Sequence, residues 1–137
     1  MFSFKGLNNK IQRLLDANPI ISGDSPITGM QCGVLSYLKI QSKDKEVFQK
    51  DIEDEFQIRR STATGILQLM EKNGLIQREA VNYDARLKKI IITEQGCETY
   101  EKVETRMQTI EGKLTQNLTN DEVENLFYLM DKIAKDI

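Results

Sequence analysis

The fold is most clearly encoded in residues 47–96, which read VFQKDIEDEFQIRRSTATGILQLMEKNGLIQREAVNYDARLKKIIITEQG. A short helical pattern covers 50–56, and a second covers 61–72. The break between them falls at 57–60, and an Asn-Gly pair at 73–74 ends the second pattern, as such pairs commonly do. This arrangement predicts two short helices joined by a tight turn.

Two extended segments follow the second helix. Residues 75–81 and 87–93 form the segments, and the later one contains a run of three isoleucines, which favours a β-strand. Residues 82–86 lie between them and predict a turn with Arg86 near its tip. The segment is therefore expected to form a two-stranded hairpin.

The second helix has two different faces. Its apolar residues recur at three- and four-residue spacing and predict one buried stripe, formed by Ala63, Ile66, Leu67 and Met70. The opposite face is small, hydroxylated or amide-bearing, and it consists of Ser61, Thr62, Thr64, Gly65 and Gln68. It carries no acid and is flanked by Arg59 and Arg60. Such a face can approach phosphates and present hydrogen-bonding groups to base edges, so we expect a helix that enters the major groove of DNA.

The hairpin adds basic residues beside this helix. Asp84 is placed to hold the Arg86 guanidinium in an extended pose, and Lys88 and Lys89 follow closely. Insertion of Arg86 into a narrow, electronegative minor groove is our interpretation, against the alternative of a solvated turn residue. The predicted DNA-binding residues are Arg59, Arg60, Ser61, Thr62, Thr64, Gly65, Gln68, Asp84, Arg86 and Lys88.

Charge is segregated along the chain, although its formal net charge is −2. Residues 58–90 contain seven basic and three acidic side chains, a net charge of +4. Residues 94–124 contain three basic and eight acidic side chains, a net charge of −5. This polarity predicts that one end of the chain faces a polyanion.

Composition restricts the remaining possibilities. The 137 residues, 39% of them hydrophobic, suffice for one core, and a single domain is expected. The sequence has no long apolar run and begins without a signal-peptide pattern, so we expect a cytoplasmic protein that does not interact with membranes. Histidine is absent and no Gly-rich phosphate loop or nucleophile motif occurs, so neither an enzyme nor a metal or other cofactor is expected.

The flanking segments have wide apolar stripes that suggest dimerisation. The N-terminal stripe is formed by Phe4, Leu7, Ile11, Leu14 and Leu15. The C-terminal stripe is formed by Val123, Leu126, Phe127, Met130, Ile133, Ala134 and Ile137. Capping boxes predict helix starts at Thr28 and Thr119, Thr93 is expected to cap a long helix over 94–117, and 18–28 is expected to be a loop.

The chain resembles the MarR family of winged-helix regulators. The resemblance rests on the order helix, helix, wing, on Asp84-Ala85-Arg86, on the 92–96 segment Ile-Thr-Glu-Gln-Gly, and on the two capping boxes. It implies a mainly α (α+β) fold, a winged helix-turn-helix with N- and C-terminal dimerisation helices. Residues 1–137 would then form one domain, with the DNA-binding lobe at 28–93 and the dimerisation region at 1–18 and 94–137.

The resemblance also implies a function. MarR-like proteins are homodimers that bind pseudo-palindromic operators on double-stranded DNA, and a ligand-responsive repressor is the expectation for this chain. Whether a small-molecule effector exists stays open. Two alternatives also stay open: a redox sensor that acts through Cys32, which lies in the first turn of its helix, and a winged-helix module that binds protein.

Overall fold

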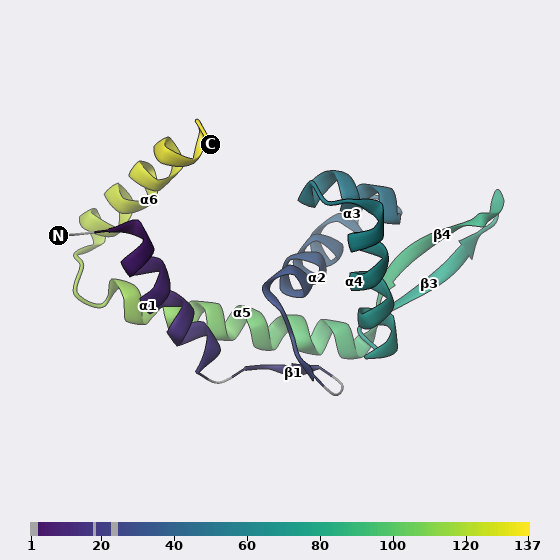
Figure 1. Ribbon diagram of the computed structural model, residues 1–137, viewed down its shortest axis with the longest axis horizontal. Coiled ribbons are helices and arrows are strands. Elements are labelled where there is room, and N and C mark those ends of the chain that lie inside the picture. The colour runs from purple at the N-terminus through teal and green to yellow at the C-terminus, as the bar shows by residue number, and fades with distance from the viewer. Residues whose placement is uncertain (1–2, 18, 23–24) are drawn as a thin grey trace. The chain divides into compact units, whose positions relative to one another are not determined.

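The computed structural model describes residues 3–17, 19–22 and 25–137 (Figure 1). Contacts divide the chain into two compact units, Met1–Glu104 and Thr105–Ile137. The boundary falls within one helix, α5 (Glu94–Thr115). The first unit contains the two short helices and the hairpin that the sequence predicts.

The helices of the first unit begin and end at recognisable local signals. Before α5 they are α1 (Phe4–Asp16), α2 (Gly29–Gln41), α3 (Gln49–Phe56) and α4 (Arg60–Lys72). The predicted capping box of α2 is confirmed, with Thr28 and Gln31 each bonding the other's backbone N–H at 3.2 Å. Helix α3 ends at Phe56, and the following Gln57, with a φ of 51°, turns the chain toward α4.

The wing is formed by β3 (Ile76–Val81) and β4 (Asp84–Ile92), which pair antiparallel (Figure 1). Only Asn82 and Tyr83 lie between the strands, so the predicted turn over 82–86 was too long. An irregularity between Ala80 and Val81 shifts the register and pairs Val81 with Asp84, which incorporates Asp84 and Arg86 into β4.

A single buried cluster connects α2, α3, α4 and the base of the wing. Its members come from all four, and they are Val34, Leu35, Leu38, Val47, Ile52, Leu67, Met70, Leu75, Ile76 and Ile90. The Ile90 N–H donates to the Val47 carbonyl at 2.7 Å, so the segment before α3 is bonded to β4. Burial of this cluster fixes α4 and the wing against each other.

The segment predicted as a loop over 18–28 contains a small hairpin. Strand β1 (Ile21–Ser22) pairs antiparallel with β2 (Ser25–Pro26). Residues 18, 23 and 24 of the predicted loop, and residues 1 and 2 of the predicted dimerisation region, lie outside the described residues. Two-residue strands contain too few residues to show an alternating pattern, which explains why sequence reasoning missed them.

Thr93 and Gly96 join the end of β4 to α5. The Thr93 hydroxyl donates to the Gly74 carbonyl at 2.6 Å and accepts from the Gly96 N–H at 2.9 Å, so Thr93 caps α5 as predicted. A Cβ on Gly96 would lie 2.2 Å from the Leu75 carbonyl oxygen. The Thr-x-x-Gly part of the 92–96 segment is therefore a packing motif that holds α5 against the start of the wing.

We expect Gly96→Ala to destabilise the protein by about 1–3 kcal/mol, because the backbone at Leu75 must move to admit the methyl group. Urea unfolding followed by circular dichroism measures the change. Gly112→Ala is the control, since a Cβ at Gly112 of the same helix meets nothing within 4 Å. The control should raise stability by up to about 1 kcal/mol. Equal effects of the two substitutions would contradict this role for Gly96.

The second unit contains the end of α5 and α6 (Asn120–Ala134). The α6 capping box is confirmed, since the Thr119 N–H donates to Glu122 Oε1 at 2.9 Å and the Glu122 N–H donates to the Thr119 hydroxyl at 3.2 Å. Helix α5 ends at Thr115, two residues before the predicted end at 117. Helix α6 is fully described and contains no buried residue.

Candidate nucleic-acid interface

The outward face of α4 is open to solvent. Ala63, Leu67 and Met70 are fully buried, and Ile66 packs partly against the same cluster, as the apolar spacing predicts. The exposed residues predicted for the opposite face are Ser61, Thr62, Gly65 and Gln68. Arg59 is the N-cap residue and its side chain makes no capping hydrogen bond, so both Arg59 and Arg60 are exposed at the start of the helix.

Thr64 differs from the other predicted residues of this face because it is half-buried. Its hydroxyl donates to the Arg60 carbonyl at 2.8 Å and accepts from Gln49 Nε2 at 2.9 Å. Gln49 Nε2 also lies 3.4 Å from the Arg60 carbonyl oxygen. Thr64 therefore helps to join α3 to the first turn of α4, a role that sequence spacing did not indicate.

The wing presents Arg86 to solvent. The Arg86 side chain is 94% exposed, and its Nε lies 3.6 Å from Asp84 Oδ1. The same carboxylate oxygen accepts the Arg86 backbone N–H at 2.9 Å. Asp84 is thus placed to orient Arg86, and Lys88 is exposed two residues further along β4.

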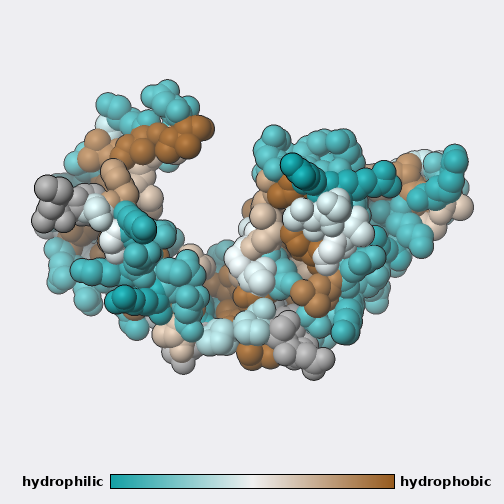
Figure 2. Space-filling view, viewed as in Figure 1, coloured by the Kyte–Doolittle hydropathy of each residue, from teal (hydrophilic) through white to brown (hydrophobic). Residues whose placement is uncertain are grey.

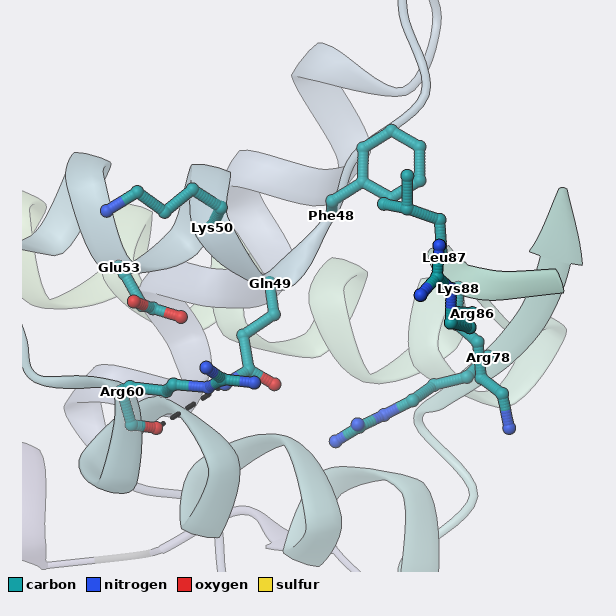
Figure 3. Close-up of a pocket in the computed structure, with 9 residues that line it drawn as sticks. All are labelled: Phe48, Gln49, Lys50, Glu53, Arg60, Arg78, Arg86, Leu87 and Lys88. Carbon is teal, nitrogen blue, oxygen red and sulfur yellow. Dashed lines mark hydrogen bonds between the residues drawn. The ribbon is translucent and has the colours of Figure 1, made fainter. Parts of the chain in front are cut away.

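A pocket of about 490 Å³ joins the start of α4 to the wing (Figure 3). Three of the predicted residues, Arg60, Arg86 and Lys88, line it together. The remaining lining residues were not predicted, and they are Phe48, Gln49, Lys50, Glu53, Arg78 and Leu87. Arg78 could have been found from the alternation of side chains along β3. Its pairing with Ile90 places it on the face of the wing that also carries Lys88.

Gln68 shares this side of α4. Arg60, Thr64 and Gln68 follow one another at four-residue spacing, which places them on one face of the helix. Arg60 lines the same pocket as Arg86. The exposed face of α4 and the cationic wing therefore adjoin, and the charged residues named on this surface are basic except for Glu53 and Asp84.

Comparison with known proteins agrees with this geometry. A family model described as the MarR family matches residues 25–87, which include α4 and part of the wing. The HTH-type transcriptional regulator PapX of Escherichia coli is 30% identical over 106 residues, which cover 76% of this chain and 64% of PapX. The transcription regulator MarR from Oenococcus oeni PSU-1 has a solved structure that is 28% identical, covers 96% of this chain and 94% of that chain, and has a TM-score of 0.58.

The chain resembles the MarR family in sequence over residues 25–87 and in fold over nearly its whole length. A solved MepR–DNA complex of S. aureus matches 96% of this chain and 89% of that chain at 24% identity, with a TM-score of 0.62. At that identity the similarity to MepR shows the fold alone, which is the winged helix-turn-helix that the sequence predicts. The matched stretch is somewhat under two thirds of PapX, at 64%.

Cys32 lies in a poor position for a reactive thiol. Burial raises the pKa of the Cys32 thiol, and a hydrogen bond from the backbone offsets this effect only in part. A helix N-terminus can lower the pKa of a thiol in its first turn, but the pKa of Cys32 near the start of α2 changes in the opposite direction. A thiol with a raised pKa provides less thiolate at neutral pH, so the geometry argues against redox sensing through Cys32.

No helix in the described part of the chain is both long and apolar enough to cross a bilayer. Among the described residues no three or more acidic, cysteine or histidine side chains cluster as metal ligands would.

Proposed function

We propose that this protein is a MarR-like, sequence-specific DNA-binding transcription regulator. The observation that carries the proposal is the adjacency of the acid-free, exposed face of α4 and the cationic wing, joined by one pocket that contains Arg60 and Arg86. The MepR–DNA complex supports it, because that protein with the same fold is seen bound to DNA. A protein-interaction module would need an apolar face on α4. Leu69, 40% exposed, is the one large apolar residue exposed on this helix, and Ser61, Thr62, Gly65 and Gln68 are small or polar.

In this proposal α4 enters the major groove and the wing reaches the adjoining minor groove. Gln68 has the amide that pairs with adenine edges, and the small residues Ser61 and Gly65 allow the helix backbone to approach the bases closely. Arg86, oriented by Asp84, extends into the minor groove, where the negative potential favours a guanidinium. Arg59, Arg60 and Lys88 contact phosphates.

The regulator acts as a homodimer through its flanking helices. Figure 2 shows hydrophobic side chains gathered along α6. The exposed fraction is 38% for Leu126, 51% for Met130 and 52% for Ile133, and in α1 it is 43% for Leu7. Exposed apolar surface of this extent marks a contact with another protein, and a second copy of the chain supplies the same surface in a two-fold arrangement.

A homodimer places two recognition helices on one duplex. Two copies of α4 then contact half-sites about one helical turn, roughly 34 Å, apart, and the operator is pseudo-palindromic. Repression in the cytoplasm, relieved by a small ligand that changes the separation of the two helices, is the form of regulation that we propose. A titration of the DNA complex with candidate ligands tests this last part separately.

Selection of bound sequences from a random duplex pool tests the proposal. We expect enrichment of an inverted repeat with half-site centres about ten base pairs apart. Enrichment of no sequence at low salt, where phosphate contacts are strongest, would overturn the proposal.

We expect Arg86→Ala to weaken binding about tenfold on selected and on unselected duplexes alike, a loss of about 1.4 kcal/mol. The variant should also lower the slope of log affinity against log salt concentration by about one. Fluorescence-anisotropy titrations at several salt concentrations measure both quantities. Arg86→Lys is the control that keeps the charge. An unchanged affinity of Arg86→Ala would refute the contact.

A further inference from the structure

Arg78 has hydrogen-bonding capacity that the described chain does not use. It is half-buried in β3, and its Nε and Nη2 atoms are buried without a hydrogen-bond partner among residues 3–17, 19–22 and 25–137. Leaving guanidinium N–H groups buried and unbonded is costly, because the charge has lost water and gained no acceptor. A turn of the side chain toward the pocket that it lines would bring these two donors to an acceptor from outside the chain.

The surroundings of Arg78 select an anion. Figure 3 shows the Arg78 side chain extending from the wing across the pocket toward the start of α4. The pocket is lined by five basic side chains and one carboxylate, that of Glu53. Lys50 has its own partner in Asp54, at 3.1 Å, and Arg86 has Asp84, at 3.6 Å. Arg78 and Arg60 thus face a cavity whose positive charge is only partly balanced.

The location of the pocket identifies the anion. On a duplex the major groove and the neighbouring minor groove are separated by one sugar-phosphate backbone. A protein that places α4 in one groove and Arg86 in the next must span that backbone, and the pocket lies between these two elements. A guanidinium can donate two parallel N–H bonds to the non-bridging oxygens of a phosphate.

We propose that this pocket receives the phosphodiester backbone between the two grooves, with the Arg78 guanidinium turning into the pocket and donating to one phosphate. The inference rests on the proposed DNA-binding function and adds to it a residue that reads no base. Arg78 then fixes the register of α4 and the wing relative to the duplex. Gln49, bonded to Thr64 and to the Arg60 carbonyl, holds the α4 side of the pocket in place.

The test is the salt dependence of DNA affinity in Arg78→Met. We expect about tenfold weaker binding and a slope of log affinity against log salt lower by about 0.9, the value for one lost phosphate contact. Lys89→Met is the matched control, because Lys89 pairs with Glu79 on the other face of the wing and does not line the pocket. The slope of log affinity against log salt for Lys89→Met should lie closer to the wild-type slope than the slope for Arg78→Met does.

A set of duplexes with the same sequence, each with one uncharged methylphosphonate at a different backbone position, locates the phosphate. At one backbone position the substitution should weaken wild-type binding and leave Arg78→Met unaffected, since the two changes remove the same interaction. Arg78→Lys should restore part of the salt slope. Thermal unfolding without DNA should show Arg78→Met at least as stable as the wild type, because an unpaired buried charge is removed.

The outcomes separate the inference from the proposed function. If the wild type binds DNA and Arg78→Met has the same affinity and slope, the phosphate contact is overturned and the function stands. If every methylphosphonate weakens DNA binding by the variant and by the wild type equally, the phosphate contact of Arg78 is again overturned and the proposed function stands. If the wild type binds no duplex at low salt, both fail.

Discussion

Gly65→Glu is expected to weaken DNA binding by at least about 100-fold, a loss of about 2.7 kcal/mol, without unfolding the protein. A Cβ at Gly65 meets nothing within 4 Å, so the chain itself has space for a side chain there. In the proposed complex that space belongs to the major groove, where a carboxylate would meet base edges and phosphates. Anisotropy titration with the selected duplex measures the loss.

Two further variants serve as controls for the effects of added charge and of changed stability. Gly29→Glu adds the same charge at another exposed glycine with nothing within 4 Å, in the first turn of α2, and should bind DNA nearly as the wild type does. Gly65→Ala removes only the helix penalty of glycine and should raise the melting temperature. Normal DNA affinity of Gly65→Glu would show that α4 does not enter the groove by this face.

The double variant Leu126→Glu, Met130→Glu is expected to convert the proposed dimer to a monomer and to weaken operator binding by at least about 100-fold. The two residues lie four apart on the apolar side of α6, with exposed fractions of 38% and 51%. Two carboxylates on each copy would have to lose water against apolar surface on the other. A monomer then contacts one half-site and loses the second set of contacts. Light scattering and anisotropy titration measure the two effects.

The control is Asn125→Glu with Lys132→Gln, which changes the net charge equally. Helical spacing places both residues on the side of α6 opposite the apolar stripe. This variant should remain dimeric with nearly wild-type affinity. If Leu126→Glu, Met130→Glu remains a dimer at micromolar concentration, the apolar face of α6 is not the interface.

Local signals explain what could be predicted. The start of α2 follows from Thr28 and Gln31, and the start of α6 from Thr119 and Glu122, because a capping box involves only neighbouring residues. The buried and exposed faces of α4 follow from spacing alone, as Leu67 on the buried side shows. Each of these features depends on residues within a few positions of one another.

Features that depend on distant pairing were missed or misplaced. The turn of the wing is shorter than predicted, because the irregularity at Ala80 and Val81 is set by the pairing of two strands. Arg78 was not predicted as a site residue, because its place in the pocket requires the register of the wing and its packing against α3 and α4. Spacing assigned Thr64 wholly to the outward face. Its bond to Gln49 joins two helices, and spacing within one helix cannot show such a contact.

Hydroxyl-radical footprinting of the selected duplex tests most directly whether α4 and the wing of two copies bind one face of DNA. We predict two protected backbone segments related by the dyad of the operator, about one helical turn apart, with flanking minor-groove protection that disappears in Arg86→Ala. A single protected segment, or wing-independent protection on both faces of the duplex, would contradict the arrangement in which Arg60 and Arg86 span one backbone.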